Sequence, residues 1–301
     1  MRYLHYLRRV ASAGLLLAVA YGSAPALARP APAEIVIEAG SGRVLHARDA
    51  DRSRQPASIA KVMTLFLVFD ALDAGRLRED KRLVVSRFAA SREPSRLGLR
   101  AGEKMTVRNA MRAVAVQSAN DAAVVLAEAV AGDERRFAAL MTAKARALGM
   151  ADTVFGNATG LPDARTRTTA RDIAVLARGI LRAHPDRYAL FGRREIKWND
   201  RSMTNHNHLL GRVTGVDGIK TGYTARAGFT LAASAKRDGR RLIAVVLGAT
   251  SRQARDDRVG ELLERGFLGR LERSAGAGAG RNVRGAVAGR KPKAVGTLAS
   301  L

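Results

Sequence analysis

Pro56-Ala-Ser58-Ile-Ala-Lys61-Val-Met-Thr64 opens the stretch of sequence that decides the fold. The apolar residues that follow recur with a helical period, which predicts a helix over residues 58–72 that ends before Gly75. Ser58 and Lys61 stand three residues apart at the start of this helix. Their side chains therefore lie on one face, a single turn apart.

A serine next to a lysine on one helix face predicts nucleophilic catalysis if the lysine is neutral. A hydroxyl is a poor nucleophile until a base removes its proton, and only unprotonated lysine can be that base. The pKa of Lys61 must then fall from about 10.4 towards about 7–8, at a cost of about 3.5–4 kcal/mol. Burial and a second nearby cation can supply this shift. Taken alone, Ser58 is more simply a helix-capping serine.

A second motif, Ser118-Ala-Asn120, stands at the junction of two helical patterns. A hydroxyl and an amide two residues apart at such a junction can face one cleft. Ser118 can then pass a proton between Lys61 and a leaving amine, and Asn120 can hydrogen-bond a substrate amide. The alternative for this motif alone is a plain capping sequence.

The third motif, Lys220-Thr221-Gly222, precedes a predicted hairpin. Lys220 and Thr221 can hold a substrate carboxylate, and Lys220 is the candidate for the second cation near the base. Gly222 has no side chain, so an extended peptide can lie against the strand. The backbone N–H groups of Tyr223 and of the candidate nucleophile can form an oxyanion hole. Alone, the motif also fits a solvated edge strand, but the three motifs in this order favour a serine acyl-transfer enzyme.

Strand signals stand at both ends of the folded part of the chain, around a helical middle. Apolar residues alternate on both sides of Gly40-Ser41-Gly42, and a second hairpin is expected from 229–235 and 242–249. Helical patterns fill much of 106–183 and the range 255–271. We therefore predict an α+β fold with one antiparallel sheet built from both chain ends and a helical subdomain between them.

The two ends of the chain differ in composition from the part between them. Residues 1–28 have the pattern of a signal peptide: early arginines, a short apolar run and a small-residue cleavage site at 26–28. An uncleaved anchor is the second interpretation. Residues 29–33 are expected to form a linker. The signal-peptide pattern predicts export to the periplasm or cell envelope. Residues 274–301 are basic and Gly/Ala-rich, which predicts a disordered tail with weak electrostatic contact to anionic membrane.

Charge and cysteine content limit the partners of the protein. The chain has 52 Lys and Arg against 27 Asp and Glu, so it is attracted to polyanions. Nucleic acid is disfavoured because aromatic residues are not interleaved with the basic clusters. The absence of cysteine excludes disulfides and thiolate metal sites. His206-Asn-His208 lacks a convincing third ligand, so no metal or other cofactor is expected.

With these residues placed, the chain resembles the serine D-alanyl-D-alanine carboxypeptidases, the low-molecular-mass penicillin-binding proteins. The resemblance covers about 33–271 and includes Leu148-Gly-Met150 and Asn157-x-Thr-Gly-Leu161 besides the three motifs. It implies a DD-peptidase/β-lactamase-like fold in a catalytic domain over 34–273. It also implies peptidoglycan stem peptides as substrates and β-lactams as covalent inhibitors.

The resemblance also implies a role for each matching residue. By resemblance, Ser58 is the acylated nucleophile, Lys61 the general base and Ser118 the proton relay. Lys220, assisted by Arg255, binds the substrate carboxylate. The expected reaction is removal of the terminal D-alanine from pentapeptide stems.

Three other functions stay open at this point. Many members of the family carry a β-rich second domain and a C-terminal anchor where this chain has its basic tail, so a compact endopeptidase that cuts cross-links is one alternative. A class A β-lactamase is another, although residues 153–170 contain no glutamate to activate the deacylating water. The third is an inactive, basic scaffold that binds the cell envelope.

Overall fold

The computed structural model describes residues 31–271. The predicted signal peptide and basic tail lie outside this range. Within it, no helix is long and apolar enough to cross a membrane.

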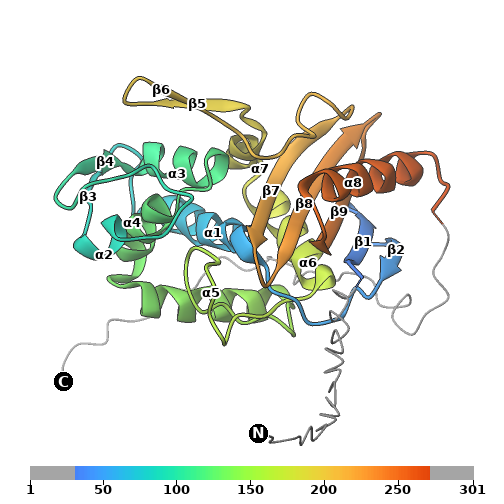
Figure 1. The fold of residues 1–301 in the computed structure, drawn as a ribbon, viewed down its shortest axis with the longest axis horizontal. Helices are drawn as coiled ribbons and strands as arrows, with labels where there is room; N and C mark the ends of the chain where they lie inside the picture. Colours follow the sequence, from blue (N-terminus) through green and yellow to red (C-terminus); the bar gives the residue numbers. More distant parts are fainter. Residues whose placement is uncertain (1–30, 272–301) are drawn as a thin grey trace, which may run out of the picture. The chain divides into compact units, whose positions relative to one another are not determined.

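A five-stranded antiparallel sheet joins the two ends of the described chain (Figure 1). Its strand order is β2-β1-β9-β8-β7. The pairing of β1 with β9 runs from Ala33 opposite Leu247 to Glu38 opposite Leu242. The predicted sharing of one sheet by terminal strands is therefore confirmed. The strands are β1 (Ala33–Glu38), β2 (Val44–Arg48), β7 (Val216–Thr224), β8 (Gly228–Arg237) and β9 (Arg240–Ala249).

The two faces of this sheet are covered by different helices. Side chains alternate between the faces of a strand, so Ile35 and Ile37 enter the core shared with α1 and α6, while Val36 enters the core shared with α8. Figure 1 shows α8 lying across β8 and β9. The helices are α1 (Ala60–Asp73), α6 (Ala170–Ala183) and α8 (Arg252–Phe267).

The helical subdomain is built around α1. The predicted helix over 58–72 is present, but its first turn is a 3-10 turn, η1 (Ala57–Ile59). Nearly all of α1 is buried, because it contacts helices on several sides as well as β7. The remaining helical elements are α2 (Arg87–Ala90), α3 (Val107–Val116), α4 (Asn120–Ala131), α5 (Glu134–Leu148), α7 (Pro185–Tyr188) and η2 (Ala189–Gly192), of which α3, α4 and α5 contact α1.

Some elements differ from the sequence prediction. Helix α8 begins at Arg252 and ends at Phe267, where the predicted helix ran over 255–271, because Ser251 caps it by accepting a hydrogen bond from Ala254 N. Two small two-stranded sheets were not predicted, since a strand of three or four residues leaves too little alternation to detect. They are β3 (Arg82–Val84) with β4 (Lys104–Thr106), and β5 (Glu195–Trp198) with β6 (Arg201–Thr204).

A buried carboxylate, Glu34, ties β1 to β2 and to α8. Its side chain is fully buried and accepts from His46 Nε2 (3.2 Å), Arg48 Nη2 (2.6 Å) and Arg258 Nη2 (2.8 Å). Burial alone would raise the pKa of Glu34. The hydrogen bonds from His46 and Arg258 and the nearby guanidinium charges outweigh it and lower the pKa to about 2.

The ion-pair cluster at Glu34 predicts a pH-dependent stability. A carboxylate with a lowered pKa stabilises the fold above its unfolded pKa and loses this contribution as the pH falls. Glu34→Gln should therefore lower the free energy of unfolding by about 3 kcal/mol at pH 7 and by only about 1 kcal/mol at pH 3. Urea denaturation at both pH values measures this. The exposed Glu261 gives the matched control, because Glu261→Gln should cost less than about 1 kcal/mol. Equal losses at both pH values would contradict the assignment.

Candidate active site

A cavity of about 380 Å³, here called the active cleft, contains side chains from all three motifs. Figure 1 shows the start of α1 beside β7, which explains how residues far apart in sequence meet. Lys61 and Lys220 lie buried, 0% and 2% exposed. The predicted site residues that line the cleft are Ser58, Ser118, Asn120, Thr221, Gly222, Tyr223 and Arg255.

Ser58 and Lys61 are in direct contact. Lys61 Nζ donates to Ser58 Oγ at 2.9 Å and to the Thr159 carbonyl at 2.6 Å. The turn that carries Ser58 is tightly constrained, since Ala57 has a positive φ of 48°. A Cβ on Gly160 would lie 1.8 Å from the Ala57 carbonyl oxygen, so only glycine fits beneath this turn.

The surroundings of Lys61 favour its neutral form. Complete burial is the main cause that holds the pKa of Lys61 well below its usual value, and the charge of Lys220 is the second. Asp121 and Glu134 act in the opposite direction but do not outweigh these two causes. Burial, followed by the charge of Arg255, lowers the pKa of Lys220 to about 7. A neutral Lys61 next to a protonated Lys220 is therefore accessible near neutral pH.

The loop after α5 presents the Thr159 carbonyl to Lys61. Asn157 Oδ1 accepts from Thr159 N (3.1 Å) and Gly160 N (2.7 Å), and its Nδ2 donates to the Leu161 carbonyl (3.0 Å). The Asn-x-Thr-Gly-Leu segment therefore positions a main-chain acceptor for the candidate base. Sequence reasoning did not find this role, because a backbone carbonyl leaves no residue-type signal.

The second motif lies where α3 ends and α4 begins. Ser118 is buried and has a positive φ of 63°, which turns the chain between the helices. Asn120 N donates to the Ser95 carbonyl (2.7 Å) and Asn120 Nδ2 to the Glu93 carbonyl (2.7 Å). Within residues 31–271, Asn120 Oδ1 is buried with no hydrogen-bond partner. This oxygen can accept an N–H from a substrate amide.

Strand β7 forms an edge of the sheet and one wall of the active cleft. A Cβ on Gly222 would lie 2.8 Å from Ser58 N and 2.6 Å from Thr230 Oγ1, so glycine is required for this close approach. The approach brings the N–H of Ser58 next to the main chain at Tyr223, as an oxyanion hole needs. The Tyr223 side chain is 55% exposed, with its ring against Phe229.

One end of the active cleft is strongly cationic. Arg255 is buried and donates from Nε to Asp256 Oδ1 at 2.9 Å, and Lys220 Nζ donates to the Thr221 carbonyl at 3.0 Å. Arg252 and His206 also line the cleft, and the sequence analysis gave neither a substrate role. The signal that could have found Arg252 is the capping residue Ser251, which starts the helix at Arg252 and so places Arg252 one turn before Arg255.

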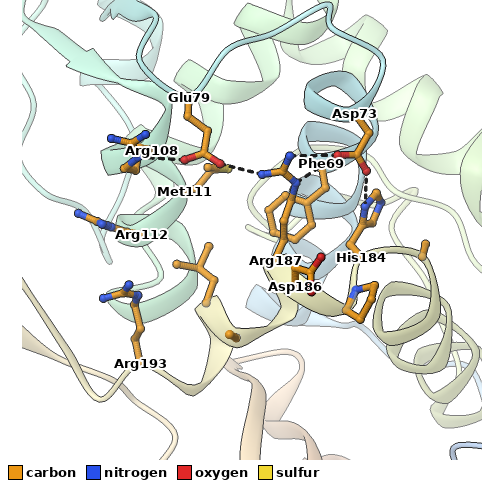
Figure 2. Close-up of a pocket in the computed structure, with 14 residues that line it drawn as sticks. Phe69, Asp73, Glu79, Arg108, Met111, Arg112, His184, Asp186, Arg187 and Arg193 are labelled. Carbon is orange, nitrogen blue, oxygen red and sulfur yellow. Dashed lines mark hydrogen bonds and ion pairs between the residues drawn. The ribbon is translucent and has the colours of Figure 1, made fainter.

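A larger cavity, of about 590 Å³, lies away from the motif residues (Figure 2). Its walls come mainly from α1, α3 and α7. Arg187 bridges Asp73 (3.0 Å) and Glu79 (2.7 Å), and Arg108 (2.9 Å) also pairs with Glu79. His184 Nδ1 lies 2.9 Å from Asp73. These ion pairs join helices, and no serine or lysine lines the cavity. The smaller cavity is the candidate active site.

Comparison with known proteins identifies the family. The family model for D-alanyl-D-alanine carboxypeptidases matches residues 21–251. The chain belongs to this family. D-alanyl-D-alanine carboxypeptidase DacF of Bacillus subtilis is 36% identical over 80% of this chain and 63% of its own length. DacD of Escherichia coli is 36% identical over 77% of this chain and 62% of its own length. The chain thus spans about three fifths of these curated relatives.

Solved structures of carboxypeptidase-family proteins have the same fold. D-alanyl-D-alanine carboxypeptidase DacD from Francisella tularensis matches with a TM-score of 0.77 and 32% identity, over 79% of this chain and 70% of its own. Penicillin-binding protein D2 from Listeria monocytogenes matches with a TM-score of 0.72 and 31% identity, over 81% of this chain and 100% of its own. The predicted DD-peptidase/β-lactamase-like fold is confirmed.

Asp121, next to the second motif, fixes the loop that forms the cleft wall opposite β7. Its fully buried carboxylate accepts from the backbone N–H groups of Leu97 (3.1 Å), Gly98 (2.9 Å) and Leu99 (3.1 Å). This loop carries Ser95, which lines the cleft. Asp121 therefore acts as a positioning residue for that wall.

Replacing Asp121 with asparagine should loosen this loop. An amide has one acceptor oxygen where the carboxylate has two, so at least one of the buried N–H groups loses its acceptor. We expect a loss of about 1–3 kcal/mol in the free energy of unfolding and faster hydrogen exchange of the Leu97 and Leu99 amides. Glu103→Gln is the control, since Glu103 accepts a single backbone N–H, from Arg100, at the exposed side of the loop. Unchanged exchange in Asp121→Asn would contradict this role.

Proposed function

We propose that the protein is a serine D-alanyl-D-alanine carboxypeptidase that removes the terminal D-alanine from peptidoglycan pentapeptide stems. One observation carries the proposal. A fully buried lysine, Lys61, lies 2.9 Å from Ser58 Oγ, which lines the active cleft, and a second buried lysine, Lys220, is near enough for its charge to lower the pKa of Lys61. The first lysine suits a base, and the second suits a counter-charge for a substrate carboxylate.

Acylation follows from this geometry. When Lys61 is neutral, the contact lets the Ser58 hydroxyl donate to Nζ, and Lys61 takes this proton as Ser58 Oγ forms a bond to the carbonyl carbon of the penultimate D-alanine. The N–H groups of Ser58 and Tyr223 stabilise the oxyanion. The C–N bond then breaks, and the proton passes through Ser118 to the leaving amine. Free D-alanine and an ester on Ser58 result.

Deacylation uses the same residues, with the proton transfers in the opposite direction. Lys61 and Ser118 assist the attack of a water molecule on the ester, and the Ser58 hydroxyl is regenerated with release of the shortened stem. The terminal carboxylate of the substrate binds at Lys220, Thr221 and Arg255, while the stem pairs with the edge of β7 in an extended conformation. Asn120 Oδ1 accepts an N–H of the stem.

β-Lactams belong to the same proposal as covalent inhibitors of Ser58. Penicillin-binding protein D2 from Listeria monocytogenes has been solved in cefotaxime-bound and ampicillin-bound forms, and this chain is 31% and 30% identical to it. The loop over 153–170 contains no glutamate, so slow hydrolysis of the acyl-enzyme is expected. We also propose that the protein is exported to the periplasm or envelope, where peptidoglycan lies, and that its basic tail makes weak contact with anionic membrane.

Mass spectrometry of muropeptides incubated with the protein tests this function. We expect pentapeptide monomers to lose one alanine, penicillin to block the loss, and Ser58→Ala to abolish both the loss and penicillin labelling. The hydroxyl is the atom that becomes acylated, so the variant retains the cleft but not the reaction. Conversion of cross-linked dimers to monomers with pentapeptides unchanged would instead assign an endopeptidase. No change in either pool would favour the inactive scaffold.

The lowered pKa of Lys220 predicts the alkaline limb of the activity. The ammonium is charged below its pKa of about 7 and neutral above it, so attraction for the substrate carboxylate declines as the pH rises through this value. In the wild-type enzyme, kcat/KM should fall above about pH 7. Lys220→Arg keeps its charge, so its alkaline decline should move to higher pH even if kcat/KM is lower at every pH. A pH profile with the same alkaline limb in both enzymes would rule out Lys220 as its source.

A further inference from the structure

The cationic end of the active cleft holds more positive charge than one terminal carboxylate requires. Arg252 and Arg255 line the cleft here, and the charge of the buried Lys220 acts on His206 in the same wall. The neighbouring carboxylate, Asp256, is already bound by Arg255 at 2.7 Å. An α-carboxylate held by Lys220, Thr221 and Arg255 leaves the guanidinium of Arg252 without a counter-charge.

Arg252 is placed to meet a second group on the leaving side of the substrate. It is the first residue of α8, one turn before Arg255, so both side chains start from the same helix face. It lines the cleft and is exposed. In the part of the chain that the structure describes, the Arg252 side chain makes no hydrogen bond or ion pair, unlike that of Arg255.

His206 forms the wall next to these cations. Its ring lines the cleft, and it has no hydrogen-bond partner among residues 31–271. Burial, followed by the charges of Lys220 and Arg252, lowers the pKa of His206 to about 4. The imidazole is therefore neutral near pH 7, and its N–H can donate to an anion in the field of the two cations.

We propose that Arg252 and His206 form a second carboxylate subsite, which accepts a leaving D-amino acid with a carboxylate in its side chain. This inference rests on the proposed function, because it takes the leaving group to lie at Lys220 and Arg255. The reaction is the same amide hydrolysis, with water consumed and a diacid released in place of D-alanine. One substrate class has this chemistry: a stem that ends in an acidic D-residue, whose α-carboxylate binds at Lys220 and Arg255 and whose side-chain carboxylate reaches Arg252 and His206.

Leaving-group selectivity is the measurable consequence. The probes are matched stem peptides ending in D-Ala–D-Ala and in D-Ala–D-Glu, with kcat/KM measured for each by release of the terminal amino acid. The wild-type enzyme should cleave both. In Arg252→Gln the ratio of kcat/KM for the D-Glu peptide to that for the D-Ala peptide should fall about tenfold, as expected for loss of one charge-assisted hydrogen bond.

A charge control separates a subsite from general electrostatic attraction. Arg226 lies exposed in the β7–β8 turn and does not line the cleft, so Arg226→Gln removes the same charge without touching the leaving group. Its selectivity ratio should equal that of the wild type. His206→Gln keeps an N–H donor of similar reach and should lower the ratio less than His206→Ala.

The outcomes distinguish this inference from the function on which it rests. Release of D-alanine with equal ratios in wild type and Arg252→Gln would overturn the subsite and leave the carboxypeptidase intact. Equal loss in Arg226→Gln and Arg252→Gln would also overturn it. No release of D-alanine by the wild type would reject the carboxypeptidase itself. Release of D-alanine by the wild type with the D-Glu peptide uncleaved would likewise overturn the subsite.

Discussion

Burial of the Lys61 ammonium next to Ser58 is the constraint on which the rest of the site depends. Removing a charge from water is expensive, and an ionisable group in such a place responds by a shift of its pKa. Two acceptors, Ser58 Oγ and the Thr159 carbonyl, contact Nζ, and no carboxylate among residues 31–271 pairs with it directly. An acid in hydrogen-bonding contact would stabilise the charged form and remove the base. The nearest acids, Asp121 and Glu134, act on Lys61 only through their charges, and this separation leaves Lys61 available as a base.

That burial requires contributions from both halves of the fold. Helix α1 is enclosed by other helices, which excludes water from one side of Lys61, and β7 closes the other side with Lys220. The closure depends on main chains that approach each other without side chains between them. Gly222 lies against Ser58 N and Gly160 against the Ala57 carbonyl, and a Cβ at either glycine would overlap the turn. The sheet edge, the nucleophile turn and the Asn157 loop therefore have to assemble together.

The side chains of the active site could be predicted from the sequence better than the backbone geometry that positions them. The terminal strands, the helix after Ser58 and the three motifs could be predicted because each has a periodic or residue-specific signal. The 3-10 turn at Ser58, the Thr159 carbonyl and the hydrogen bonds of Asp121 could not, since they arise from backbone groups placed by tertiary contacts. His206 was rejected as a metal ligand and was not placed in the cleft. Its place in the cleft depends on how the segment after β6 packs, which local pattern does not encode.

The distribution of counter-charges separates the two cavities more clearly than their size does. Four arginines line the larger one, and two of them, Arg108 and Arg187, pair with Glu79 and Asp73 and so hold neighbouring segments together (Figure 2). In the active cleft, Lys220 donates only to a neutral carbonyl. Cations in a confined, partly desolvated space attract anions more strongly than the same charges on an open surface. In the active cleft Asp256 pairs with Arg255, which leaves Lys220 and Arg252 to attract an anionic substrate.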